Sequence, residues 1–193
     1  MKCDYLEINH YRRHFKGKTK SNDKFDKIIK RQELETLLKK TDIILPTKRH
    51  YFIETLYSHY EHTHYIEDLE KSKKILETKY PQYLYAFDVV MKRRTGHMFN
   101  MFIMKKELAD SYCSFIFDIL FELEKQTNPS QYNKYQARLY GYISELLLDV
   151  WIMQNNLKYK EVPFINMEKT KWLKKGSSFL KAKFFGKKYD GSF

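Results

Sequence analysis

Two long segments with apolar side chains at helical spacing constrain the fold of this chain more than any other feature. Residues 105–125 carry apolar side chains every three or four positions, and residues 135–155 are more apolar still. This spacing predicts an amphipathic helix in the first segment and a strongly apolar helix in the second. Any strands must therefore lie outside these two segments.

Short apolar segments rich in strand-forming residues lie between further predicted helices. We predict strands at residues 3–9, 42–46, 98–104 and 159–167, the first of them buried and the last a sheet edge because Pro163 interrupts it. We predict helices at residues 31–40, 51–60, 66–79 and 81–93, and an exposed loop at residues 16–30. Helices between successive strands favour an α/β fold with a mixed or mostly parallel sheet.

Net charge and cysteine content narrow the classes of partner and compartment. The 193-residue chain has a net charge of +12, which attracts nucleic acid, acidic membrane surfaces or phosphorylated substrates without choosing among them. Cys3 and Cys113 lie far apart and show no metal-binding or redox spacing, which favours a reduced, cytoplasmic setting. No apolar run reaches the ~18 residues that cross a membrane.

A candidate anion site follows the first predicted strand, where His10, Tyr11, Arg12 and Arg13 stand together. Ligands of open α/β sheets bind at the carboxyl ends of strands. Two guanidinium groups there could bind a diphosphate bidentately, and His10 could donate a hydrogen bond to a phosphate or a sugar hydroxyl. The alternative is a strand that leads into a solvated basic loop.

Polar residues inside two apolar segments mark a second candidate site. His97 and Asn100 lie in or beside the third predicted strand, where buried polar side chains need partners or a cavity. Glu145 lies on the second long helix, with Asp149 one turn later and Arg138 about two turns earlier. A carboxyl group beside a packed apolar face has a raised proton affinity, as a general base requires. Local capping by Asn100 and an ion-paired or solvated Glu145 are the structural alternatives.

Three histidines, His59, His62 and His64, lie within six residues. Zinc is disfavoured because the set lacks cysteine and has no pair of histidines at i, i+4 with a glutamate base. Contacts with sugar hydroxyl groups, or simple polarity at a helix end, fit these residues better.

Residues 168–193 form a predicted C-terminal tail, distinct from a domain at residues 1–167. The lysines of the tail alternate with aromatic side chains. This composition suits an anionic membrane surface and also single-stranded nucleic acid. A tail that packs its aromatic side chains on the domain is the structural alternative.

Four segments carry a resemblance to a known family. They are DYLEINHYRRHF at residues 4–15, ETLYSHYEHTHYIEDL at residues 54–69 after Tyr51, HMFNMFIMKKEL at residues 97–108 and YGYISELLLDVW at residues 140–151. In this order they resemble bacterial glycosyltransferase-like proteins that are found among capsular and exopolysaccharide synthesis enzymes and were long catalogued as a domain of unknown function. The resemblance extends over about residues 3–167.

The resemblance implies a GT-A-like fold and a cytoplasmic enzyme at the inner face of the plasma membrane. Such an enzyme moves a sugar from a nucleotide-sugar donor to a lipid-linked or polysaccharide acceptor. The resemblance assigns donor binding to His10, Tyr11, Arg12, Arg13, His97 and Asn100, acceptor binding to His59, His62 and His64, and catalysis to Glu145 with Asp149 in reserve. Glu145 would be the base if the reaction inverts.

The sequence contains no Asp-x-Asp metal motif, which GT-A-like enzymes usually have. We therefore expect no cofactor, with Arg12 and Arg13 offsetting the charge of the leaving diphosphate. A divalent metal is the alternative.

Two features depart from the family pattern. Relatives carry early nucleotide-binding strands before the segment that ends in His-Tyr-Arg-Arg, so we expect a truncated chain, with a partner chain as one source of the missing strands. Leu146 stands where relatives often have arginine. The competing hypotheses are an inactive fragment that needs such a partner, and a basic nucleic-acid-binding protein, which no recognisable binding motif supports.

Overall fold

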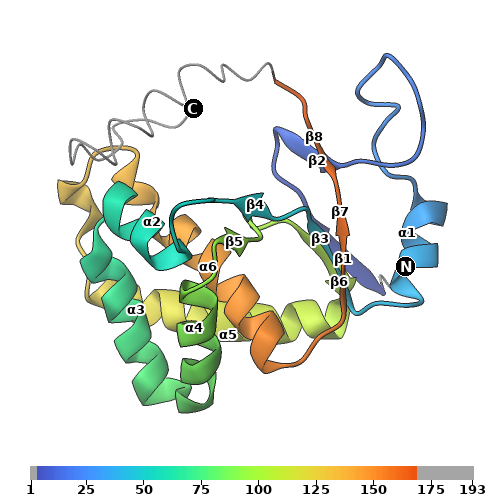
Figure 1. The fold of residues 1–193 in the computed structure, drawn as a ribbon. Helices are drawn as coiled ribbons and strands as arrows, with labels where there is room; N and C mark the ends of the chain where they lie inside the picture. The colour runs from blue at the N-terminus through green and yellow to red at the C-terminus, as the bar shows by residue number, and fades with distance from the viewer. Residues whose placement is uncertain (1–3, 169–193) are drawn as a thin grey trace.

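The computed structural model describes residues 4–168, in which a small central sheet lies between a large helical layer and a smaller one (Figure 1). The strands are β1 (Tyr5–Ile8), β2 (Arg13–Phe15), β3 (Ile43–Pro46), β4 (Arg49–His50), β5 (Thr95–Gly96), β6 (Phe102–Lys105), β7 (Tyr159–Val162) and β8 (Phe164–Asn166). The α-helices are α1 (Arg31–Leu38), α2 (Leu56–Thr63), α3 (Ile66–Lys79), α4 (Leu84–Met91), α5 (Lys106–Lys125) and α6 (Leu139–Gln154), and the short 3-10 helices are η1 (Pro81–Tyr83), η2 (Pro129–Gln131) and η3 (Gln136–Arg138). The predicted α/β class is confirmed.

The central sheet is mixed, with the strand order β1-β6-β3-β7. Strand β6 pairs antiparallel with both β1 and β3, whereas β7 pairs parallel with β3. The mixed alternative is thus confirmed and the mostly parallel one is wrong, because β6 runs antiparallel to both of its neighbours. Strand β7 is an edge strand, as predicted, but it ends before Pro163. The rest of the predicted strand forms β8, which pairs with β2 in a separate two-stranded sheet.

The two inner strands separate two apolar cores, because successive residues of a strand point to opposite faces. Side chains on one face pack in the larger core with helices α2 to α6, and they are Ile43, Leu45, Phe102 and Met104. Side chains on the other face pack in the smaller core with Phe15 and Leu38, and they are Ile44 and Ile103. Figure 1 accordingly shows α1 on one side of the sheet and the remaining helices on the other.

Three local predictions differ from the structure. Strand β1 is an edge strand of the central sheet and is largely exposed, not buried, because the helical layers cover β3 and β6. The second predicted helix begins at Leu56, not at residue 51, because Thr55 and Ser58 form a capping box there. Residues 98–101 form a turn, and β6 begins only at Phe102.

Two further predictions concern a membrane. Within residues 4–168, no helix is long and apolar enough to cross a bilayer. The predicted basic aromatic tail lies, from residue 169 onward, outside the described residues. The boundary between domain and tail is therefore still a prediction.

Leu147→Ala is expected to lower the free energy of unfolding by about 2–5 kcal/mol, because Leu147 of α6 is fully buried in the larger core and its truncation leaves a cavity. Tyr85→Ala removes an exposed side chain on α4 and is expected to change the free energy of unfolding by less than about 0.5 kcal/mol. Urea unfolding measures both. Equal changes in the free energy of unfolding for the two variants would contradict the central position of α6.

Candidate functional site

The candidate site forms where α6 meets the turn that precedes β6. Phe99 and Asn100 in this turn have φ angles of 83° and 52°. Residues other than glycine rarely adopt this left-handed conformation, so surrounding contacts must hold it. The turn directs the backbone N–H of Phe99 at the carboxylate of Glu145, to which it donates a hydrogen bond.

Side chains on both sides of the turn connect it to α6. Asn100 Nδ2 donates to the carbonyl oxygen of Gly141 over 3.1 Å, and Ser144 Oγ lies 3.1 Å from Asn100 Oδ1. The backbone N–H of His97 donates to Asp149 Oδ2 over 3.0 Å, and His97 Nδ1 lies 2.5 Å from Asp149 Oδ1. These contacts lie before and after the glutamate along α6, so they position its carboxylate against the turn.

Burial and three guanidinium groups shift the pKa of the Glu145 carboxylate in opposite directions. Burial raises the pKa of Glu145 and is the largest cause, the Phe99 N–H lowers it, and so do the charges of Arg138, Arg49 and Arg13. The result is a pKa of about 7. The raised proton affinity predicted from the sequence is confirmed, and such a carboxyl group can accept a proton near neutral pH.

Arg13 is the member of the predicted basic strand end that lies near the glutamate. Its guanidinium carbon lies 4.0 Å from the centre of the Phe99 ring, and its Nη1 lies 3.3 Å from His10 Nδ1. Partial burial and then the charges of Arg13, Arg12 and Arg138 lower the pKa of His10. Its imidazole is therefore neutral near pH 7 and can accept the Arg13 N–H.

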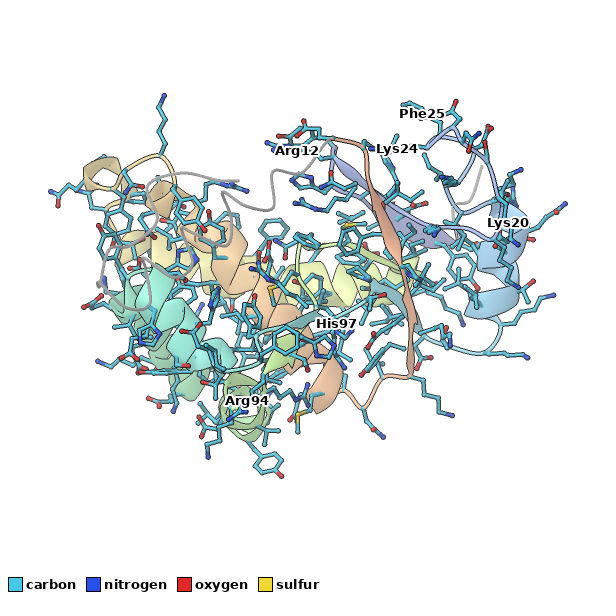
Figure 2. All side chains as sticks on the ribbon, turned by 45° about the horizontal axis from the view of Figure 1, so that its top comes forward. Arg12, Lys20, Lys24, Phe25, Arg94 and His97 are labelled. Carbon is cyan, nitrogen blue, oxygen red and sulfur yellow. The ribbon has the colours of Figure 1, made fainter. Side chains whose placement is uncertain are left out.

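Arg12 and Tyr11 make contacts with groups other than Glu145. Arg12 Nη1 forms an ion pair with Glu168 Oε2 at 3.3 Å, and the Arg12 guanidinium lies over the Tyr11 ring. Tyr11 is exposed, and Figure 2 shows Arg12 at the edge of the molecule. Of the four predicted residues, the structure thus brings Arg13 to the glutamate and His10 to Arg13, while donor binding by all four stays a prediction.

His97 and Asp149 are buried side chains, only 1% and 2% exposed, and Figure 2 shows His97 in the interior. His97 Nε2 lies 3.4 Å from Glu161 Oε1 of β7, without a hydrogen bond to any described residue. The pair therefore joins α6, the turn and β7. Donor binding by His97 and a reserve catalytic role for Asp149 stay predictions, whereas their contacts support the turn directly.

The three clustered histidines contact other protein groups. His59 Nδ1 and His62 Nδ1 each lie 2.8 Å from a carboxylate oxygen of the buried Glu54, and His64 Nδ1 lies 2.9 Å from Gln136 Oε1. In the part of the chain that the structure describes, no group of three or more His, Cys, Asp or Glu side chains could hold a metal ion. Acceptor binding by these histidines stays a prediction.

Gly141 leaves open space one turn before Glu145 on α6. A Cβ added at Gly141 would meet no neighbouring atom within 4 Å. Alanine is the better residue inside a helix, so neither packing nor backbone geometry requires glycine here. Neither Gly141 nor Arg49 was predicted. The i, i+4 spacing to Glu145 was an available signal for Gly141, whereas Arg49 reaches the site only through the tertiary position of β4.

The fold defines a glycosyltransferase-like α/β protein. The chain is similar to the apo structure of the bifunctional glycosyltransferase WbbM, with 28% sequence identity and a TM-score of 0.77 over 88% of this chain, which spans 34% of that protein. A family model described as a domain of unknown function, DUF4422, matches residues 1–156, and the chain belongs to this family. No curated protein sequence matches the chain.

Glu145→Gln is expected to remove a pH dependence of stability between about pH 4.5 and about pH 7. Because burial holds the pKa of Glu145 at about 7, above its ordinary value of 4.5, the folded state binds one more proton in this window. Its stabilising effect is complete below pH 4.5 and is lost as pH rises through 7.

Relative to the glutamine variant, the wild type is therefore expected to be more stable at pH 5 than at pH 8 by about 1–3 kcal/mol. Urea unfolding at the two pH values measures this difference. Glu124→Gln, an exposed position on α5, is the control. The same pH dependence in wild type and Glu145→Gln would contradict the raised pKa.

Proposed function

We propose that this protein is a glycosyltransferase that moves a sugar from a nucleotide-sugar to a hydroxyl group of an acceptor glycan. The observation that carries the proposal is Glu145, whose pKa of about 7 arises beside three guanidinium groups in a fold similar to that of a glycosyltransferase. Transfer requires a base for the acceptor hydroxyl and positive charge for the leaving diphosphate. The site offers both within one cluster.

In this mechanism Glu145 takes the proton of the acceptor hydroxyl while its oxygen attacks the anomeric carbon. The bond between that carbon and the diphosphate oxygen breaks, and its electron pair leaves with the diphosphate. Attack from the face opposite the leaving group inverts the anomeric configuration. The Phe99 N–H keeps the carboxylate oriented during this step.

Arg13 and Arg49 would offset the negative charge that develops on the leaving diphosphate. Their charges already act on Glu145, so both guanidinium groups lie close to the reacting atoms in this proposal. Arg49 replaces Arg12 of the sequence hypothesis, because Arg12 pairs with Glu168. A divalent metal is not required when guanidinium groups supply this charge.

Finer parts of the proposal concern the acceptor and the partners. We infer a lipid-linked or polysaccharide acceptor in capsule or exopolysaccharide synthesis at the inner face of the plasma membrane, which the family resemblance and the net charge of +12 support. A partner chain could add a strand beside β1, because β1 is an edge strand of the central sheet and exposes Leu6 and Ile8.

Glu145→Gln is expected to lower turnover by at least about 100-fold, because an amide cannot accept the proton of the acceptor hydroxyl. Release of nucleoside diphosphate from a panel of nucleotide-sugars, with the glycan product identified by mass spectrometry, measures turnover. Glu124→Gln is the matched control and should retain full activity. Turnover of Glu145→Gln within a few-fold of wild type would remove Glu145 from the base role.

The same assay in EDTA tests the charge of the leaving group, and wild-type activity is expected to survive. Activity that EDTA abolishes and a divalent metal restores would contradict the proposed role of the arginines. It would leave the role of Glu145 intact.

Gly141→Ala is expected to stabilise the fold and to impair catalysis. Alanine should raise the free energy of unfolding by about 0.5–1 kcal/mol, while its methyl group fills the space beside Glu145 and raises KM. Thermal unfolding and steady-state kinetics measure the two effects. Ser111→Ala, an exposed position on α5, should leave KM unchanged. A stabilised Gly141→Ala variant with wild-type KM would place the substrate elsewhere.

A further inference from the structure

Two apolar side chains project into solvent from the segment between β4 and α2. Phe52 and Ile53 are 78% and 60% exposed, and we call this pair the apolar tip. Phe52 has a φ of 50°, a left-handed conformation that is unfavourable for a bulky aromatic residue. Asparagine or glycine would suit this backbone better. Phe52 has one ring contact, with the exposed His50, whose ring centre lies 6.1 Å away. This contact leaves most of both apolar side chains in solvent.

The base of the apolar tip is anchored on both sides. Glu54, the next residue, is buried, and its two carboxylate oxygens each lie 2.8 Å from a histidine of α2. On the other side, Arg94 Nη1 donates to the carbonyl oxygen of Phe52 over 3.2 Å, and the Tyr51 N–H donates to the carbonyl oxygen of Arg94 over 2.9 Å. These anchors hold the two apolar side chains outward.

Exposed basic side chains lie around the apolar tip. They come from β4 and from the segment after α4, and they are Arg49, His50, Lys92 and Arg94. The two segments run side by side, since β4 pairs with β5. Residues 47–53 and 92–96 contain no carboxylate, and the buried Glu54 is held by histidines. Figure 2 shows Arg94 at the edge of the molecule, opposite Arg12.

We propose that Phe52 and Ile53 insert into the interfacial region of a membrane that contains anionic lipids, while Lys92 and Arg94 contact the lipid headgroups. Aromatic and aliphatic side chains flanked by cations have the composition that partitions into such an interface. A specific protein interface buries about 800 Å² per partner, far more than two side chains supply, whereas a bilayer accepts a small projecting tip.

Membrane docking through the apolar tip does not depend on the proposed transferase activity. If both hold, the contact lies close to the site, because the charge of Arg49 also acts on Glu145. A lipid-linked acceptor could then be reached from the docked surface. Binding through so few groups is weak and reversible, so it requires anionic lipid.

Sedimentation of the full chain with phosphatidylglycerol–phosphatidylcholine vesicles tests the proposal. Phe52→Asn is expected to lower the partition coefficient about tenfold. Its thermal midpoint should stay unchanged or rise, because asparagine adopts a positive φ more readily than phenylalanine. Loss of binding together with retained or increased stability separates docking from folding.

Lys92→Gln tests the charge component. It is expected to lower the partition coefficient about fivefold in low salt, with the difference vanishing in about 0.5 M salt. Phe117→Ala is the matched control for exposed aromatic surface, since Phe117 is exposed on α5 beside Asp118 and should not affect binding.

Three outcomes would overturn the proposal. The first is an unchanged partition coefficient for Phe52→Asn. Since this variant retains every other part of the chain, that result would assign any vesicle binding to those parts. The second is an equal loss for Phe117→Ala, which would indicate unspecific adsorption. The third is that Phe52→Asn lowers binding of a single-stranded oligonucleotide but not of vesicles, which would make the tip a nucleic-acid contact.

Discussion

The packing of α6 against the turn at residues 97–100 is the interaction on which the rest of the structure depends. Asp149 is a carboxylate inside the larger core, where it would be strongly unfavourable without donors. The backbone N–H and Nδ1 of His97 contact its two oxygens. The same contact holds the residues between β5 and β6, which run in one direction, antiparallel to β4 and β3.

The two acidic side chains of α6 lie in different environments because they make different contacts with the turn. Asp149 is enclosed and contacts two groups of His97, whereas Glu145 receives one N–H from Phe99 and is otherwise acted on by the charges of three guanidinium groups. Burial raises the proton affinity of Glu145 more than the positive charges lower it. One carboxylate therefore supports the site while the other is available for chemistry, a division of roles set by environment.

Local sequence patterns predicted the elements well where a segment is long and periodic. The helix predicted at residues 66–79 is α3 at the same residues, and both long helices are present with boundaries shifted by a few positions at most. Predictions were wrong where a tertiary contact overrides the local preference. Residues 98–101 have strand-like composition, yet Phe99 and Asn100 have positive φ angles and interrupt the strand, while Asn100 bonds to Gly141 and His97 to Asp149.

The sequence by itself determined that the chain has long apolar helices and a small sheet, and it indicated a carboxyl group of raised proton affinity on α6. These follow from side-chain periodicity and from the position of Glu145 among apolar neighbours. Only the tertiary structure decided which cations approach that carboxylate. Arg49, absent from the sequence hypothesis, lies near it, and Arg12, present in it, pairs with Glu168. The reason is physical: spacing along a helix relates residues of that helix alone, whereas charges on β2, β4 and η3 meet only when strands pair and helices pack.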